Sequence, residues 1–263
     1  MMRLANRKVL VVGASAGVGR ASGMAIAAEG GRVAFAARRL ERLEQAATEA
    51  GEGSLAVACD VGNEGSCSEA VAAAADGLGG LDAIVYCPGV GVFEPIETIG
   101  AEAWRRTMDI NLIGASLIMN AAIPHLEAST SEHRGKAVFI SSIVIDDRPP
   151  RTRYAPYVVS KVALETLAQA WQGEHREVGF TTIAMADTVT EFGLDHDVTK
   201  LLPIVAEWDR LDYGYGRAMA AESVAAQVVN ALASPETVRR IAITPRYGEA
   251  ETMAAAVADR VGR

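Results

Sequence analysis

The sequence is poor in positive charge, in cysteine and in long apolar runs, and each shortage excludes a class of protein. Its 25 lysine and arginine residues are outnumbered by 33 acidic residues, for a net charge of −8, so no nucleic-acid partner is expected. The three cysteines, Cys59, Cys67 and Cys87, lack metal-type spacing and indicate reduced thiols in a cytoplasmic protein. No apolar run approaches membrane-spanning length, and the first residues lack the apolar core of a signal peptide. The sequence therefore predicts a soluble protein without a membrane partner.

Histidine and lysine are also scarce. No histidine spacing is typical of metal ligands, so no metal site is predicted; the four histidines are His125, His133, His175 and His196. Lysine also occurs four times, and Lys161 lies four residues after Tyr157 in a segment of helical periodicity. Because residues four apart share one face of a helix, this pair is a candidate for acid/base chemistry.

The chain is rich in short apolar runs that alternate with longer segments of helical periodicity. Seven runs have the character of strands buried on both faces; they lie at 9–13, 33–37, 54–59, 83–87, 137–141, 181–186 and 240–244. Helical patterns lie near 17–29, 39–50, 64–78, 102–128, 155–177 and 222–233. Such β-α alternation implies a parallel sheet with right-handed crossovers. The predicted fold class is α/β: a single doubly wound Rossmann domain over residues 1–263, with a seven-stranded parallel sheet and helices on both faces.

Two segments interrupt this alternation. Residues 143–153 are rich in charge and proline, which predicts a surface loop before the helix of Tyr157. Residues 187–217 form the longest connection and mix acidic residues with leucines, Trp208 and two tyrosines. A long connection in a compact domain is typically a lid or a disordered segment, and the apolar content favours a substrate lid.

A glycine-rich turn follows the first predicted strand and opens a helix. The stretch GASAGVG contains Gly13, Gly17 and Gly19, with Val18 between the last two. Glycine at such a position allows a tight turn and lets the backbone approach a pyrophosphate, whose charge meets free N–H groups and the helix dipole. The turn therefore predicts a dinucleotide site. The alternative is that the glycines serve only the close packing of helix on strand.

The end of the second predicted strand indicates which dinucleotide is bound. A carboxylate there would accept hydrogen bonds from the adenosine ribose, but the sequence reads Ala37-Arg38-Arg39. Arginine pairs bidentately with a 2′-phosphate, so NADP(H) is favoured over NAD(H), with Arg38 as the main reader and Ser15 as a helper. The alternative is that both arginines are solvated residues at the start of the next helix.

The glycine turn, the serine pair after the fifth predicted strand and the Tyr157–Lys161 pair resemble the short-chain dehydrogenase/reductase family over nearly the whole chain. The resemblance implies that Tyr157 is the catalytic acid/base, Lys161 its partner, Ser142 the substrate-orienting hydroxyl and Asn111 the fourth member of the set. It also implies a homotetramer or homodimer built partly on the helices of Asn111 and Tyr157. Further cofactor contacts implied by the resemblance are Asp60, Val61, Gly89, Thr188 and Thr190.

The predicted reaction interconverts a small, apolar ketone and its secondary alcohol. For Tyr157 to act near neutrality, its pKa must fall from about 10 to about 7, which takes ~4 kcal/mol of preferential phenolate stabilisation. The Lys161 ammonium in a water-poor cleft is expected to supply much of this stabilisation. Ser142 would hold the carbonyl oxygen while Tyr157 protonates it, and Asn111 would hold a water that links Lys161 to solvent.

Several alternatives stay open at the level of sequence. Tyr157 could be a core tyrosine and Lys161 a solvated helix residue. The chain could also be an NADP(H)-sensing regulator without turnover, or an imine or enoyl reductase. Two segments depart from the family pattern: Tyr86-Cys87-Pro88-Gly89 stands for Asn-Asn-Ala-Gly, and Met185-Ala186 stands for Pro-Gly. Cys87 is more typical of a small apolar filler than of a nucleophile.

Overall fold

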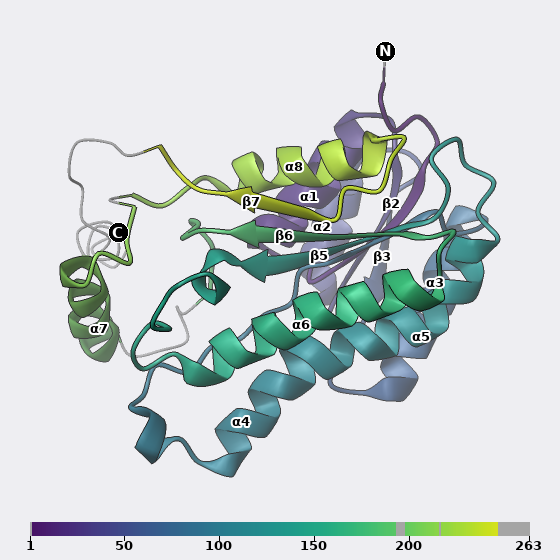
Figure 1. Cartoon of the computed structure of the whole chain (residues 1–263). Coiled ribbons are helices and arrows are strands. Elements are labelled where there is room, and N and C mark those ends of the chain that lie inside the picture. Colours follow the sequence, from purple (N-terminus) through teal and green to yellow (C-terminus); the bar gives the residue numbers. More distant parts are fainter. Residues whose placement is uncertain (1, 193–197, 216, 247–263) are drawn as a thin grey trace.

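Seven strands form one parallel sheet in the computed structural model of the chain (Figure 1). The structure describes residues 2–192, 198–215 and 217–246. The strand order is β3-β2-β1-β4-β5-β6-β7, and every neighbouring pair is parallel. The strands are β1 Lys8–Val12, β2 Arg32–Ala37, β3 Leu55–Ala58, β4 Ala83–Tyr86, β5 Lys136–Ser142, β6 Gly179–Met185 and β7 Arg240–Ile243. The predicted seven-stranded parallel sheet is confirmed.

Helices cover both faces of this sheet. Helices α1, α2 and α8 pack on one face, and α3, α5 and α6 pack on the other (Figure 1). The helices are α1 Gly17–Ala28, α2 Leu40–Ala50, α3 Glu64–Leu78, α4 Ala101–Met108, α5 Gly114–Glu127, α6 Ala155–Glu174, α7 Val198–Arg210 and α8 Ala221–Ala233. Short helical turns are η1 Ile96–Thr98, η2 Asp109–Ile113 and η3 Ile143–Ile145. Of the helices in the described ranges, none combines the length and the apolar character needed to cross a bilayer.

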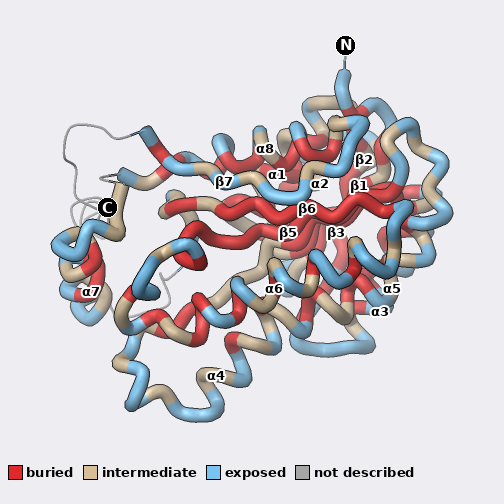
Figure 2. The backbone as a smooth tube through the Cα atoms, viewed as in Figure 1, coloured by how far each residue is buried: buried red, intermediate tan, exposed pale blue. Residues whose placement is uncertain are grey.

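Alternate residues of the central strands enter two separate cores. In β1, Leu10 and Val12 face the helices α3, α5 and α6, whereas Val9 and Val11 face α1, α2 and α8. All four side chains are fully buried, and the central strands are buried along most of their length (Figure 2). Because successive strand residues point to opposite faces, a strand that is covered on both sides needs an unbroken apolar run. The sequence VLVV meets this requirement.

The order of the strands reverses beside β1. From β1 the chain passes to β2 and β3 on one side, and it then crosses to β4 on the other side of β1. The loops that leave the carboxyl ends of β1 and β4 therefore run in opposite directions. The crevice between such loops is where open α/β sheets bind their ligands.

The segment predicted as one helix over 102–128 is divided in the structure. A π-helical turn, η2, separates α4 from α5 and contains Asn111. The hydroxyl of Tyr86, which is fully buried at the end of β4, donates a hydrogen bond to the carbonyl of Ile110 in this turn. A buried phenol hydroxyl needs a partner, and a π-turn carbonyl provides one. Single π turns inside helices are rare and frequently lie at functional sites.

The prediction of a surface loop over 143–153 is wrong for part of the segment. Residues Ile143–Ile145 form the turn η3 and are buried, because these aliphatic side chains join the hydrophobic clusters that include residues of α6, α7 and the sheet. Arg151 is also buried, with an exposed fraction of 3 %. Charge and proline content alone did not show that this segment carries an internal ion pair.

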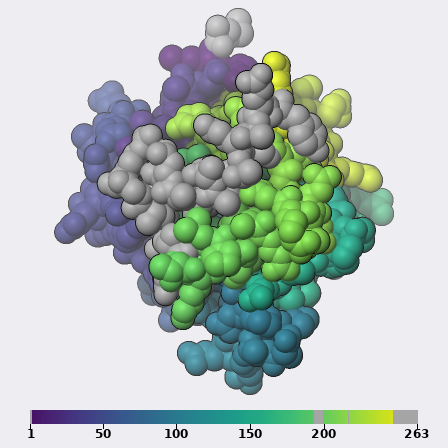
Figure 3. Space-filling model, turned by 90° about the vertical axis from the view of Figure 1, so that its left-hand side faces the viewer, coloured from purple at the N-terminus to yellow at the C-terminus, as the bar shows by residue number. Residues whose placement is uncertain are grey.

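The predicted lid, residues 187–217, contains a helix. Ile204, Val205 and Trp208 of α7 are buried against residues of η3 and the start of α6. In the space-filling view, the green atoms of α7 cover the middle of one face, above the blue atoms of α4 (Figure 3). Residues 193–197 and 216 of the predicted lid lie outside the described residues. The segment is thus anchored by packed aliphatic and aromatic side chains where the structure describes it.

Candidate active site

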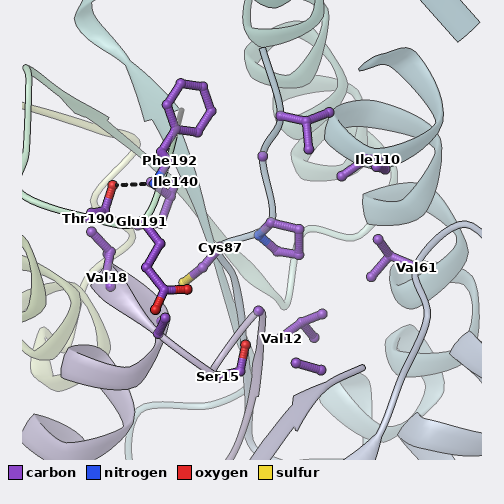
Figure 4. A pocket seen from close by; sticks show the side chains of 18 of the residues that line it. Val12, Ser15, Val18, Val61, Cys87, Ile110, Ile140, Thr190, Glu191 and Phe192 are labelled. Carbon is purple, nitrogen blue, oxygen red and sulfur yellow. Dashed lines mark hydrogen bonds between the residues drawn. The ribbon is translucent and has the colours of Figure 1, made fainter. Parts of the chain in front are cut away.

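A cavity of about 390 Å³ opens at the carboxyl ends of the strands. Its walls come from the β1–α1 turn, the end of β2, the loops after β3 and β4, helix α6 and the segment after β6. Val18, Thr190 and Glu191 lie on one side, with Val61 and Ile110 on the other (Figure 4). The predicted site residues that line the cavity are Gly13, Ser15, Gly17, Val18, Gly19, Arg38, Asp60, Val61, Gly89, Tyr157, Lys161 and Thr190. The predicted site residues outside its lining are Asn111, Ser142 and Thr188.

The three glycines of the β1–α1 turn have different roles. Gly13 and Gly17 have φ values of 80° and 52°, which favour glycine. A Cβ on Gly13 would lie 3.0 Å from the backbone nitrogen of Pro88, and one on Gly17 would lie 3.1 Å from Thr190. A Cβ on Gly19 would lie only 2.3 Å from the carbonyl oxygen of Gly13. Gly19 therefore serves the close packing of α1 on the strand, whereas Gly13 and Gly17 shape the cavity.

The N-terminus of α1 faces the same cavity. Among the described residues, no side chain caps this end of the helix, and its first turn contains no acidic residue. Uncapped N–H groups and the positive end of the helix dipole attract anions. Together with the glycine turn, these groups fit the pyrophosphate of a dinucleotide.

A cluster of charged groups lies at the end of β2. Arg39 donates to the Ser15 hydroxyl from Nε (3.1 Å) and Nη2 (2.8 Å). Its Nη1 lies 2.7 Å from one carboxylate oxygen of Glu191, and Arg42 Nη1 lies 2.7 Å from the other. The hydrogen bond from Arg39 holds the pKa of Glu191 below its usual value. Arg38 is exposed and makes no hydrogen bond or ion pair with the described residues, although it lines the cavity.

Two members of this cluster were missed by the sequence reasoning. Arg42 follows Arg39 by three residues, so both lie on one face of the helix start, and this spacing could have identified it. Glu191 is 152 residues away from Arg39, and nothing in its local sequence indicates the contact.

Tyr157, Lys161 and Ser142 come together beside the cavity. Tyr157 and Lys161 lie one turn apart on α6, and Lys161 Nζ lies 5.6 Å from the centroid of the Tyr157 ring. The Lys161 ammonium donates a hydrogen bond of 2.8 Å to the carbonyl of Ile140. Ser142 ends β5 beside Tyr157, and a hydrogen bond with it acts to lower the pKa of Tyr157. All three residues of the predicted set are buried, between 2 % and 6 % exposed.

Burial determines the ionisation of this pair. The pKa of Tyr157 is raised to about 12, chiefly by burial, with a smaller opposing effect from the Ser142 hydrogen bond. Burial also lowers the pKa of Lys161 to about 8. The expectation that Lys161 lowers the Tyr157 pKa when the cofactor is bound stays a prediction. In the protein alone, the Lys161 ammonium lies over the Tyr157 ring and donates to the carbonyl of Ile140.

Asn111 holds the loop after β4. Its side-chain oxygen accepts from the N–H of Val90 (2.8 Å), and its amide donates to the Val90 carbonyl (2.9 Å) and the Ser160 hydroxyl (2.9 Å). A Cβ on Gly89 would lie 3.9 Å from the Asn111 oxygen and 3.6 Å from Lys161 Nζ. Asn111 is fully buried. Its position thus fixes the loop that borders the lysine.

A layer of aromatic rings borders Tyr157. Tyr154 stacks on Tyr157 with ring centroids 4.5 Å apart, and Phe192 meets Tyr157 edge-on at 5.3 Å. Tyr154 also stacks against Phe93, with ring centroids 4.9 Å apart, and packs against Trp208 of α7, with centroids 5.2 Å apart. The sequence reasoning named Trp208 within the lid but missed Tyr154, Phe93 and Phe192 as neighbours of the site. Only the spacing of Tyr154, three residues before Tyr157, could have indicated a shared helix face.

A buried ion pair lies behind this layer. Arg151 contacts Asp147 (2.8 Å) and Asp187 (3.3 Å), donates to the carbonyl of Tyr213 (2.8 Å) and lies over the Trp208 ring. Its side chain is 1 % exposed. A buried guanidinium needs such compensation, and here the partners come from three separate segments. Arg151 thus ties the loop before α6 to the segments after β6 and α7.

The remaining predicted positions have simpler surroundings. Thr188 donates its hydroxyl to the carbonyl of Ala186, and its backbone pairs with that of Met219. Thr190 accepts from the N–H of Phe192 (Figure 4). Burial raises the pKa of the Cys87 thiol to about 12, as expected for an inert thiol. Among the described residues, no group of three metal-ligating side chains is present.

Comparison with known proteins places this geometry in context. A family model described as short chain dehydrogenase matches residues 7–200. An uncharacterized oxidoreductase of Mycobacterium tuberculosis is 34 % identical over 192 residues, which is 68 % of this chain and 54 % of that protein. The chain therefore spans about half the length of this curated relative.

Two solved structures resemble the fold closely. An alcohol dehydrogenase from the archaeon Thermococcus sibiricus, complexed with 5-hydroxy-NADP, has a TM-score of 0.77 and 24 % identity, covering 92 % of this chain and 96 % of that one. A 3-ketoacyl-(acyl-carrier-protein) reductase from Brucella melitensis, complexed with NADH, has a TM-score of 0.78 and 22 % identity, covering 91 % of this chain and 97 % of that one. At this identity, the likeness concerns the fold alone.

Proposed function

Because this chain belongs to the short-chain dehydrogenase family, an NAD(P)-dependent group of oxidoreductases, we propose that it interconverts a ketone and a secondary alcohol with NADP(H) as its cofactor. The observation that carries the proposal is the meeting of the Tyr157 and Ser142 hydroxyls beside Lys161, at the wall of the cavity that contains the glycine turn. The Mycobacterium tuberculosis relative is described only as an oxidoreductase, so the proposed substrate class rests on the site.

Each side chain has a defined part in the reaction. The glycine turn and the N-terminus of α1 would hold a nicotinamide cofactor, which when bound would supply a hydride to the carbonyl carbon. Ser142 donates a hydrogen bond to the carbonyl oxygen and holds it for attack. Tyr157 gives its proton to the same oxygen as negative charge develops there. Lys161 provides a positive charge at the face of the Tyr157 ring.

The preference for NADP(H) is supported by the positive groups at the end of β2. A 2′-phosphate is best met by a guanidinium fork together with a hydroxyl. Arg39 and Ser15 are already joined in this arrangement, and Arg42 adds a second positive charge within reach of the same carboxylate. We therefore propose that Arg39 makes the main contact with the 2′-phosphate and that Arg38 lies at the rim of the cavity.

The proposal extends to the whole chain. Residues 1–263 act as one nucleotide-binding domain, with the segment 187–217 as a lid over an apolar substrate. The aromatic layer of Phe93, Tyr154, Phe192 and Trp208 beside Tyr157 supports an apolar substrate. A homotetramer or homodimer is also proposed, because α6 leaves Val159 and Val162 each 46 % exposed.

The experiment is a panel of ketones and secondary alcohols assayed with NADPH, NADH and their oxidised forms. Turnover of a ketone with NADPH is expected. Tyr157→Phe should lower kcat by a factor of about 10² to 10⁴ and leave nucleotide binding, followed by fluorescence titration, nearly unchanged. A panel without turnover, or a Tyr157→Phe variant that keeps its rate, would contradict the proposed activity.

A further inference from the structure

Tyr154 is a second phenol within contact of the acid/base tyrosine. It lies three residues before Tyr157, at the residue that precedes α6. The two rings are nearly parallel, with an interplanar angle of 15° and centroids 4.5 Å apart. A hydrogen bond with Tyr154 is among the influences that lower the pKa of Tyr157. Both residues are buried, at 5 % and 6 % exposure, so water does not compete freely for this bond.

The position of Tyr154 is fixed from several sides. Phe93 stacks on its ring at 4.9 Å, and Trp208 of α7 packs against it at 5.2 Å. Trp208 is itself held by a hydrogen bond of 3.0 Å from its indole N–H to the carbonyl of Thr152. A Cβ on Gly91 would lie 2.9 Å from the Tyr154 ring, so the glycine leaves the space that the ring occupies. The hydroxyl is therefore preorganised rather than free to rotate away.

We propose that Tyr154 is a positioning residue for catalysis, whose hydroxyl donates a hydrogen bond to the Tyr157 oxygen and stabilises the phenolate that forms when Tyr157 gives up its proton. This inference rests on the proposed function, in which Tyr157 is the proton donor. Ser142 supplies the second hydroxyl at the same oxygen. Two donors on one phenolate oxygen offset part of the cost of burying its negative charge.

The direction of this bond follows from the surroundings of the two phenols. The hydrogen bond lowers the pKa of Tyr157, whereas the pKa of Tyr154 is raised well above 10 by burial and by the charge of its neighbour. Tyr157 therefore ionises first, and Tyr154 keeps its proton to donate. The charged or titratable groups that face the pair are Asp187 after β6, Arg151 in the loop before α6, and Lys161 on α6 itself.

The test compares Tyr154→Phe with Tyr213→Phe. The first variant removes the hydroxyl and keeps the ring stack. The control makes the same chemical change in the same cluster, where Tyr213 donates to the Pro149 carbonyl instead of to Tyr157. The assay is the oxidation of 1-phenylethanol, or of whichever panel alcohol reacts, from pH 6 to pH 10 with saturating NADP⁺, whose positive ring would lower the Tyr157 pKa from its value in the protein alone. In Tyr154→Phe, the midpoint of the kcat profile is expected to rise by about one pH unit, with KM for the alcohol changed less than twofold.

A second measurement does not depend on turnover. Tyrosine labelled with ¹³C at Cζ reports the ionisation of each phenol, and the signals of Tyr157 and Tyr154 are assigned from their Phe variants. With saturating NADP⁺, the Tyr154 signal of the unmutated protein is expected to shift in step with the ionisation of Tyr157. This result would stand even if every panel alcohol failed to react, which would refute the proposed reaction but not the hydrogen bond.

Two results would overturn the inference. One is a pH midpoint that is the same in the unmutated protein and in Tyr154→Phe, because a ring that serves only packing would leave the midpoint in place. The other is a Tyr154 carbon signal that stays constant while Tyr157 ionises. An equal shift in Tyr213→Phe would also count against it, since that would make the effect a general property of the aromatic cluster.

Discussion

Burial and hydrogen bonding act in opposite directions on the ionisation of Tyr157. The apolar surroundings raise the pKa of the phenol to about 12, while hydrogen bonds from Ser142 and Tyr154 lower it. Lys161 lies over the ring rather than at the oxygen, so its influence is spread over the ring face. Tyr157 is therefore protonated at neutral pH, which is the form that the proposed ketone reduction requires.

The buried Lys161 makes stability depend on pH. Its pKa is about 8 in the folded protein against 10.5 ordinarily, so between these values the unfolded chain holds more protons and stability rises with pH. Relative to Lys161→Met, the unfolding free energy of the unmutated protein should therefore increase by up to ~3 kcal/mol from pH 7 to pH 10. Urea unfolding of both proteins at these two pH values measures the difference. Parallel pH dependences would show that Lys161 keeps its proton throughout this range.

At the scale of elements, helices and loops bring polar groups to the site that no single element could supply. The π-helical turn η2 presents Asn111 to the loop after β4, and the Tyr86 hydroxyl bonds the carbonyl of Ile110 in that turn. This explains how Tyr86 replaces an asparagine of the family pattern. The phenol contributes a hydrogen bond from β4 to the helix rather than within its own loop.

The segment after β6 places a carboxylate where the proposed phosphate would lie. Glu191 is bound by Arg39 and Arg42, and a 2′-phosphate would have to displace it. All three side chains are 46–49 % exposed, so the pairs are worth at most about 1 kcal/mol. Glu191→Gln should accordingly lower KM for NADPH by about two- to fivefold and leave KM for NADH unchanged.

The control for this change is Glu49→Gln. It removes the same charge from another exposed arginine pair, that of Arg20, outside the lining of the nucleotide cavity. Steady-state kinetics of both variants measure KM for NADPH and for NADH, and only Glu191→Gln is expected to change KM for NADPH. A KM for NADPH that rises in Glu191→Gln would instead make Glu191 a direct ligand of the adenosine ribose.

At the scale of the whole molecule, the doubly wound sheet brings β1, β4 and β5 side by side and sets their carboxyl ends around one crevice. The crossing from β3 to β4 separates the loops on either side of β1, and α6 returns Tyr157 to the same edge. The two cores on opposite faces of the sheet hold this arrangement. Residues from distant segments can therefore line one cavity.

The exposed apolar face of α6 predicts assembly. Val159 and Val162 lie close to Tyr157 and Lys161 along α6, and Ile113 of η2 is equally exposed, at 46 %. Burying such a face between subunits removes apolar surface from water. The double variant Val159→Glu/Val162→Glu should dissociate the proposed homotetramer or homodimer, which light scattering after size-exclusion chromatography measures. Leu40→Glu, at an exposed position on α2, should keep the mass of the unmutated protein, and a monomeric unmutated protein would contradict the proposal.

Much of the fold could be predicted from local patterns. Apolar runs such as VLVV and AIVY can be buried on both faces only in a covered parallel sheet. Their alternation with helical segments predicted the seven parallel strands that the structure contains. The division of 102–128 could not be predicted, because the π turn depends on the Tyr86 contact from β4. The helix in 187–217 was missed because Pro203 lies within it, and its stability comes from packing on distant residues.

The sequence by itself determined which residues are close along the chain: the glycine turn between a strand and a helix, and Tyr157 one turn before Lys161. These relations follow from backbone geometry over a few residues. The tertiary structure decided that Arg39 rather than Arg38 meets Ser15, that Glu191 lies across from them, and that the Tyr154 ring stacks on that of Tyr157. The physical reason is that burial, charge neighbours and hydrogen-bond direction depend on segments up to 152 residues apart, whose meeting is fixed only when both cores are packed.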